Sequence, residues 1–182
     1  SHASTGGAFS GTGLPPHGMR VVGIAKAYAT RVGEGPFPSE LQGDLAERLR
    51  KAGNEYGSTT GRPRRIGWFD AVAVRYSAAL SGADELVVTN LDVLSGFDSF
   101  QLVTRYRFPD GTETDRFGAF DLETAVPITE TFEGFAQNLR EVRRFDDLPV
   151  QAQRYIQAIE RHTGLPIKTI SVGPERQQVI LR

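Results

Sequence analysis

The spacing of hydrophobic and polar residues predicts three helices. Leucines recur at every fourth position over residues 40–52, with charged residues between them, which indicates an amphipathic helix that ends at Gly53. A second helix is predicted over 70–81, because Asp70 is a good capping residue and a glycine follows the last helical position. The pattern over 148–163 predicts a third helix, with a proline in its first turn and a glycine after its end.

Runs of β-branched and aromatic residues predict the strands between these helices. The run "VVGIAKAYATRVG" at 21–33 indicates a strand, or a short helix leading into one. Residues 85–94, "ELVVTNLDVL", read as a short apolar strand that opens into a polar loop. The alternating run at 100–108 is followed by "PDG" at 109–111, which predicts an antiparallel hairpin. A last strand is predicted at 166–171, "PIKTIS", before a turn.

Helices that feed strands whose ends open into polar loops are typical of an α/β layer, in which ligands bind beyond the carboxyl ends of the strands. With 182 residues, 39% of them apolar, the chain suits one domain or one lobe of a larger one. Residues 1–19 are rich in glycine, serine and threonine, and we expect them to form a loop. Because the chain begins at Ser1 without a methionine, we expect it to be a piece of a longer protein.

Charge and composition narrow the classes of partner. The 21 Lys and Arg residues balance 22 Asp and Glu residues, which argues against a nucleic-acid partner. No apolar run is long enough to span a membrane and no signal-peptide pattern opens the chain, so a cytoplasmic location is the expectation. The absence of cysteine excludes thiolate chemistry, and three scattered histidines do not predict a metal site.

The most unusual segment is "YGSTTGRPRR" at 56–65, where three arginines gather in a chain of balanced charge. Three permanently charged guanidinium groups have no favourable place in a core, so the segment is predicted to be a surface loop. Its glycines let the backbone approach a ligand, its threonines can donate to an oxyanion, and Arg62 and Arg64 can each bind a carboxylate or phosphate with two hydrogen bonds. The alternative is a solvated basic turn without a ligand.

Two further loops carry candidate chemistry. In "TNLD" at 89–92, Asp92 follows a predicted buried strand, and one carboxylate can accept both N1–H and the 2-amino group of guanine. Adenine has an acceptor at N1, so such a carboxylate selects guanine. In "SVGP" at 171–174, backbone amides can donate to a carbonyl such as guanine O6. The alternatives are a helix cap or turn at Asp92 and an ordinary turn at 171–174.

Five segments, in order, resemble the adenylosuccinate synthetase family, whose members join aspartate to IMP with GTP. They are "GIAKAYATRVGEGPFPSEL", "GNEYGSTTGRPRRIGWFDAVAVRYS", "TNLDVLSG", "DLPVQAQRYIQAIERHTGLPI" and "ISVGPERQQVI". The resemblance runs along nearly the whole chain. It implies that residues 1–182 are the carboxyl-terminal segment of a single domain of this family. The implied fold is the carboxyl-terminal portion of a large, mostly parallel sheet with flanking helices and an antiparallel hairpin.

The resemblance also implies roles for individual residues. The mobile loop that binds aspartate corresponds to Ser58, Thr59, Thr60, Gly61, Arg62, Pro63 and Arg64. The IMP contacts correspond to Arg62 and Val32. The GTP contacts correspond to Arg64, Asn90, Leu91, Asp92, Ser171, Val172 and Gly173. One departure concerns Asn90, because the family usually has a lysine there, whose stem packs over the purine.

The ligands that the resemblance implies are IMP, L-aspartate and the co-substrate GTP, with Mg²⁺ bound by residues of an amino-terminal part that this chain lacks. That part would also hold the catalytic acid and base, so no catalytic or metal-binding residue is expected in this segment, and the chain alone is predicted to be inactive. The complete enzyme would be a homodimer. The alternative function is a non-catalytic module, derived from the same family, that binds guanine nucleotide or another protein.

Overall fold

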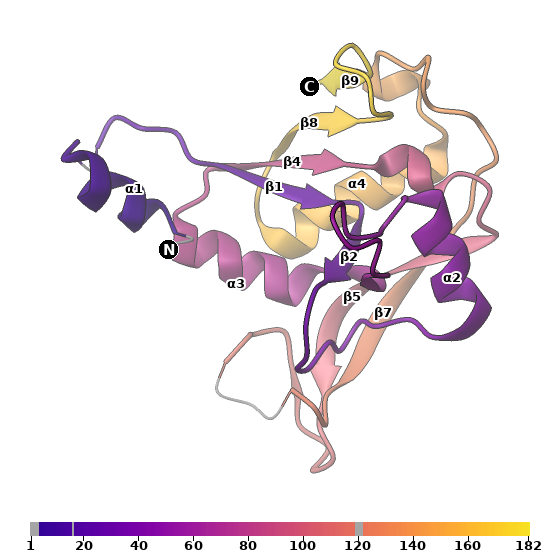
Figure 1. The fold of residues 1–182 in the computed structure, drawn as a ribbon, viewed down its shortest axis with the longest axis horizontal. Coiled ribbons are helices and arrows are strands. Elements are labelled where there is room, and N and C mark those ends of the chain that lie inside the picture. Colours follow the sequence, from indigo (N-terminus) through magenta and orange to yellow (C-terminus); the bar gives the residue numbers. More distant parts are fainter. Residues whose placement is uncertain (1–3, 16, 119–121) are drawn as a thin grey trace.

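The structure is a computed structural model that describes residues 4–15, 17–118 and 122–182. In these ranges it is an α/β fold built on two sheets (Figure 1). The single residue Ala27 connects the last strand position of one sheet to the first of the other. The α/β class and the mostly parallel character of the first sheet confirm the prediction. None of the helices in the described ranges has the length and apolar character that a membrane span requires.

The first sheet places three strand ends at one edge. Its strand order is β1-β4-β8-β9, and β1, β4 and β8 run parallel. The strands are β1 (Val22–Lys26), β4 (Glu85–Thr89), β8 (Ile167–Ser171) and the antiparallel β9 (Val179–Leu181). Because the carboxyl ends of parallel strands meet at one edge, the segments that follow β1, β4 and β8 lie next to one another.

The second sheet carries the predicted hairpin and two strands that were not predicted. Its members are β2 (Tyr28–Arg31), β3 (Arg65–Asp70), β5 (Ser99–Arg107), β6 (Glu113–Thr114) and β7 (Val126–Glu133). The β5–β6 pair confirms the hairpin, although β6 has only two residues. The long partner of β5 is β7, and β3 joins the sheet by pairing with β2 and β5.

Within the described residues, four helices and two short 3-10 turns complete the fold. They are α1 (Thr5–Thr12), α2 (Gly43–Ala52), α3 (Ala71–Ser81), α4 (Val150–Thr163), η1 (Leu91–Leu94) and η2 (Phe145–Asp147). The predicted ends of α3 and α4 are confirmed, because both stop at a glycine in the left-handed region.

Two expectations about the helices were wrong. Within residues 1–19, which we expected to form a loop, α1 is present, although residues 1–3 and 16 of that stretch lie outside the described part of the chain. The second concerns α2, which is shorter than the helix that the leucine spacing over 40–52 predicts. The helix starts at Gly43, where φ is 65°, and Leu41 instead donates its N–H to the Ile66 carbonyl at 2.9 Å.

An aromatic cluster forms the centre of the main core. The Phe100 ring lies 4.8 Å from the ring of Tyr155 on α4 and 6.0 Å from that of Phe132 on β7, measured between centroids. Tyr155 is fully buried and donates its hydroxyl to the Ala27 carbonyl at 2.7 Å. Through this bond, α4 holds the junction between the two sheets.

Asp70 caps α3 from inside the protein. Its Oδ1 accepts the Ala73 N–H at 3.0 Å, and its Oδ2 accepts the Tyr106 hydroxyl at 2.6 Å. Burial raises the pKa of this carboxyl, and the hydrogen bonds from Tyr106 and the helix backbone counteract that rise only in part. The Asp70 carboxylate therefore accepts hydrogen bonds from two buried donors, but the burial of its negative charge costs free energy.

We expect Asp70→Ala to lower the free energy of unfolding by about 2–3 kcal/mol, because it removes the cap and leaves the buried Tyr106 hydroxyl without its partner. Asp70→Asn, which keeps an acceptor for the cap, should cost less. Because the folded-state pKa is raised, the stability advantage of wild type over Asp70→Asn should be greatest below the unfolded pKa of about 3.9 and decline as pH rises through the folded value. Urea unfolding of all three proteins over a pH series measures this, and an advantage that grows with pH would contradict it.

Candidate functional site

Residues 56–64 of the arginine-rich segment form a loop, as predicted, whereas Arg65 is the first residue of β3. The base of this loop is narrow. Three successive pairs of residues face each other across this base through backbone hydrogen bonds or a β-bridge: Glu55 with Arg64, Tyr56 with Pro63, and Gly57 with Arg62. Residues 58–60 at the tip are exposed, and Gly61 turns the chain back with a φ of 64°. Backbone contacts therefore fix the base of the loop, while its exposed tip is accessible to a ligand.

The two arginines that flank Pro63 have different surroundings. Arg62 is exposed, and its backbone N–H lies 3.4 Å from the Thr60 hydroxyl. The Arg64 side chain is 32% exposed, and its Nη1 forms an ion pair of 2.7 Å with the Glu55 carboxylate. One arginine is thus free in solvent, and the other is held at the base of the loop.

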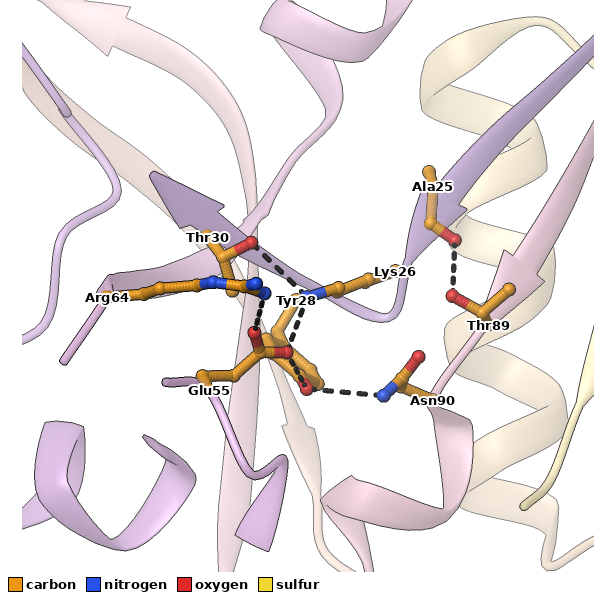
Figure 2. A network of polar contacts seen from close by, with 8 residues as sticks. All are labelled: Ala25, Lys26, Tyr28, Thr30, Glu55, Arg64, Thr89 and Asn90. Carbon is orange, nitrogen blue, oxygen red and sulfur yellow. Dashed lines mark hydrogen bonds and ion pairs between the residues drawn. The ribbon is translucent and has the colours of Figure 1, made fainter. Parts of the chain in front are cut away.

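Glu55 is the centre of this arrangement (Figure 2). Its side chain is only 2% exposed. One carboxylate oxygen, Oε1, accepts hydrogen bonds from the Lys26 ammonium at 2.5 Å and the Tyr28 hydroxyl at 2.7 Å. The other, Oε2, accepts the Arg64 guanidinium. A single buried carboxylate therefore joins the end of β1, the start of β2 and the base of the loop.

The ionisation of this cluster follows from its contacts. Burial works to raise the pKa of the Glu55 carboxyl, but hydrogen bonds from Lys26, Tyr28 and Arg64 and the charge of Lys26 outweigh it and hold that pKa below its ordinary value. Burial, followed by the hydrogen bond to the Glu55 carboxylate, raises the pKa of the Tyr28 hydroxyl. At neutral pH the network therefore contains one carboxylate, two cations and a neutral tyrosine.

The same tyrosine reaches the segment after β4. The Asn90 side chain points toward the Tyr28 hydroxyl (Figure 2), and its nitrogen lies 3.5 Å from that oxygen. Asn90 has a φ of 61°, a left-handed conformation that asparagine adopts more readily than most residues. The expected polar loop at this point is the 3-10 turn η1, in which Leu91 is buried.

Asp92 lies in η1 with its side chain 16% exposed. Burial raises the pKa of its carboxyl, and a hydrogen bond from its own backbone and the nearby Arg140 charge act in the opposite direction. The Arg140 Nε is 4.0 Å from the Asp92 Oδ2. Asp92 does not provide the cap of η1, because Asn90 occupies that position.

The segment after β8 lies beside this carboxylate. The Ser171 hydroxyl donates to the Gly173 carbonyl at 2.9 Å, and the Val172 N–H donates to the Gln178 carbonyl at 2.9 Å. A methyl group added at Gly173 would lie 3.3 Å from the Arg140 side chain and would overlap that of Gln178. The Arg140 side chain therefore lies close both to Asp92, after β4, and to Gly173, after β8.

Val32 lies near the base of the loop. Arg31 pairs with Arg65 in the antiparallel β2–β3 ladder, so the residue after Arg31 lies opposite the residue before Arg65, which is Arg64. The Val32 side chain is 80% exposed. Val32, predicted to contact IMP, thus directly follows the strand that pairs with the start of β3, whereas Ser171 to Gly173 lie at the far strand of the parallel set.

Sequence reasoning missed four residues that organise this site: Lys26, Tyr28, Glu55 and Arg140. A charged residue in a polar stretch is expected at the surface, so nothing in "GNEYG" distinguishes Glu55 as buried. The one available signal is a lone carboxylate seven residues before the first of three arginines. Within the described ranges, no three His, Asp or Glu side chains are grouped so that they could hold a metal ion.

Comparisons with known proteins show the family of the chain. The family model described as adenylosuccinate synthetase matches residues 1–180. Adenylosuccinate synthetases from Exiguobacterium sibiricum and Desulforamulus reducens are 45% and 48% identical over 184 residues; each match covers 100% of this chain and 43% of the relative. The structure of a fully ligated adenylosuccinate synthetase from Plasmodium falciparum matches with a TM-score of 0.94 and 37% identity, covering 100% of this chain and 44% of that one. The chain thus spans less than half the length of these relatives, and it belongs to the adenylosuccinate synthetase family.

Proposed function

We propose that this chain provides the aspartate-binding loop and the guanine pocket of a GTP-dependent ligase that joins L-aspartate to IMP to form adenylosuccinate. One observation carries the proposal. An unbroken series of polar contacts runs from Arg64 through Glu55 and Tyr28 to Asn90, so that the fold joins the arginine-rich loop to the "TNLD" segment. The two segments with ligand-binding chemistry therefore belong to one site.

The loop has the chemistry that a dicarboxylate requires. Aspartate carries two carboxylates, and Arg62 and Arg64 can each bind one with paired hydrogen bonds. The exposed hydroxyls of Thr59 and Thr60 supply further donors. Closure of the tip over the ligand would bring Arg62 out of solvent and exclude water from the reacting amine.

The segments after β4 and β8 suit a guanine base. The Asp92 carboxylate can accept the two donors on the Watson–Crick edge of guanine, and the backbone at Ser171 to Gly173 lies along the next strand end. Arg140 lies between them and limits the space beside Gly173. An adenine base would present an acceptor to the Asp92 carboxylate and would be disfavoured.

In the reaction that the family implies, GTP transfers its γ-phosphoryl group to O6 of IMP. The amine of aspartate then attacks C6, so that a C–N bond forms and the C–O bond to the phosphorylated oxygen breaks, releasing phosphate. Magnesium would supply charge neutralisation on the phosphates. The described residues do not fit a metal site, so we assign this chain only the binding and orientation of aspartate, IMP and guanine. GTP, IMP and L-aspartate are its proposed ligands, and a homodimer is the proposed assembly of the complete enzyme.

A nucleotide titration tests the guanine pocket. In a protein-detected NMR titration, GDP should shift the amide resonances of residues 90–92 and 171–173, and ADP should not. Asp92→Ala should weaken GDP binding at least about tenfold, because it removes two hydrogen bonds to a charged acceptor. Since only the ionised carboxylate accepts both donors, GDP affinity should fall with decreasing pH, beginning above the ordinary aspartate pKa of about 3.9.

The matched control is Asp110→Ala, in the exposed turn before β6, which should leave GDP binding unchanged. Equal shifts with GDP and ADP, or unchanged GDP binding in Asp92→Ala, would refute the guanine assignment.

The alternative of a non-catalytic, nucleotide-binding or interaction module rests on Asn90, which stands where the family usually has lysine. Mixing the chain with the complementary part of the Exiguobacterium sibiricum relative separates the two functions. The ligase proposal predicts that adenylosuccinate forms in the mixture, that the chain alone forms none, and that Arg62→Ala in the chain abolishes the recovered activity. A folded mixture that binds GDP but forms no product would favour the module.

A further inference from the structure

Glu55 has no role in the family resemblance described above, yet it is the most fully buried charge at the site. It lies one residue before the loop, and each of its carboxylate oxygens faces a cation. The backbone is fixed at the same point, because the Glu55 carbonyl accepts the Arg64 N–H at 3.0 Å. Arg64 is thus held by Glu55 at both its main chain and its side chain.

The charges around Glu55 do not cancel. One carboxylate faces the ammonium of Lys26 and the guanidinium of Arg64, which leaves the cluster with a net charge of +1. The Lys26 and Arg64 side chains are 29% and 32% exposed, so both cations reach solvent while the carboxylate does not. A second anion can therefore approach from the solvent side and find a positive site that is already assembled.

Arg64 keeps donors available for such an anion. In the described contacts, its ion pair with Glu55 uses only Nη1, so the hydrogens of Nη2 remain for an anion that approaches from solvent. A guanidinium is planar and rigid, so fixing one nitrogen against a buried carboxylate limits the positions of the others. The Arg62 side chain lacks this restraint. It is exposed, and it lies two residues before Arg64 in the loop.

We propose that Glu55 is a positioning residue for ligand binding. It holds Arg64 in place before a dicarboxylate arrives, so that only the exposed tip of the loop, with Arg62, must become ordered on binding. The proposal rests on the proposed function, because it takes Arg64 as a ligand-binding residue. Its physical basis is pre-organisation, which removes the entropic cost of ordering a long side chain at the moment of binding.

The first test observes the Arg64 side chain without any ligand. In NMR spectra of arginine side chains, the Nη hydrogens of Arg64 should give separate, slowly exchanging signals in the wild-type chain. In Glu55→Gln they should merge through free rotation, because the amide offers at most a weak neutral acceptor. Tyr28→Phe is the matched control. It removes a different hydrogen bond to the same carboxylate and should leave the Arg64 signals separate.

Unchanged Arg64 signals in Glu55→Gln would overturn the proposal. If Glu55→Gln loses its dispersed amide spectrum and is therefore unfolded, Glu55→Asp is measured in its place. This variant keeps the negative charge, but its side chain is one methylene group shorter. A folded Glu55→Asp chain with unchanged Arg64 signals would overturn the proposal equally.

The second test is a double-mutant cycle for L-aspartate binding, measured by calorimetry or NMR titration. Glu55→Gln and Arg64→Gln should each weaken binding by about tenfold or more, the size of one charge-assisted hydrogen bond. The double variant should bind no more weakly than Arg64→Gln alone, because Glu55 acts through Arg64. Multiplicative losses in the double variant would show that Glu55 acts independently and would overturn the positioning role.

Failure of the proposed function gives a different result. If the wild-type chain does not bind L-aspartate, or if Arg62→Ala binds it equally well, the assignment of the loop is wrong. The Arg64 side-chain signals then still decide whether Glu55 fixes that arginine.

Discussion

Phe100→Ala is expected to lower the free energy of unfolding by about 3–5 kcal/mol. Phe100 is fully buried, and its ring contacts those of Phe132, Phe135 and Tyr155. Alanine would leave a cavity between the second sheet and α4, because three rings on different elements cannot all move inward to fill it. The loss combines the transfer free energy of the ring with the aromatic contacts that it makes.

The Phe100→Ala substitution should also loosen the backbone at the candidate site. Tyr155 packs on Phe100 and holds the Ala27 carbonyl, so a loosened α4 should increase hydrogen exchange at the amides near Lys26 and Tyr28. Chemical denaturation gives the stability change. Tyr76→Ala is a suitable control, because that ring is 41% exposed and its stacking on Phe117 lies outside the main core, so the cost should be below about 1 kcal/mol. Similar losses in both variants would contradict a core centred on Phe100.

Gly134→Ala is expected to lower the free energy of unfolding by about 3 kcal/mol or more, the upper end of the range for overpacking. The methyl group would overlap the Phe97 carbonyl oxygen and lie 2.6 Å from that carbonyl carbon and 2.8 Å from the Asp98 carbonyl carbon. These are backbone atoms, so no side-chain rotation can relieve the clash. The Gly134 N–H also donates to the Asp98 carbonyl at 2.8 Å, and this bond would have to stretch or break.

Gly11→Ala is the control for this substitution. Gly11 lies in α1, and a methyl group there would meet nothing within 4 Å. Since alanine favours a helix by about 1 kcal/mol over glycine, Gly11→Ala should leave global stability unchanged or raise it slightly. Thermal unfolding of the two variants provides the comparison, and a Gly134→Ala chain as stable as wild type would mean that the Phe97 backbone moves aside freely.

Local sequence signals were sufficient where the structure depends on local contacts. Asp70 begins α3 with a side-chain cap, and Gly82 and Gly164 end α3 and α4 with φ values of 63° and 74°. The alternation over β5 gave the hairpin because that strand buries mainly one set of side chains. These features depend on residues a few positions apart, so a single sequence contains them.

Elements that depend on tertiary contacts were missed. In β3, five consecutive residues are buried, so the strand shows no alternation, and its short apolar run follows directly after the arginine-rich loop. Helix α1 consists mainly of glycine, serine and threonine and has no buried residue, so neither propensity nor periodicity indicates it. The edge strand β9 has three residues and is defined by its partner β8.

The candidate site also contains both residues that were predicted from the sequence and residues that were missed. Arg62, Arg64 and Asp92 were predicted to bind ligands because their chemistry is unusual for their positions, and that assignment stays a prediction. The residues that organise them were not identified, because Glu55 and Lys26 are 29 positions apart and meet only after β1 and the loop have been assembled. Candidate ligand-binding side chains can thus be proposed from a sequence more readily than the buried partners that contact them.

The hydrogen bond from Tyr155 to Ala27 bears on the order of events during synthesis. It joins residues 128 positions apart, at the junction where β1 becomes β2. During synthesis, β1 and β2 therefore leave the ribosome long before α4, the helix that holds the junction between them. The corner that presents Lys26 and Tyr28 to Glu55 should therefore reach its final geometry only after α4 has been released.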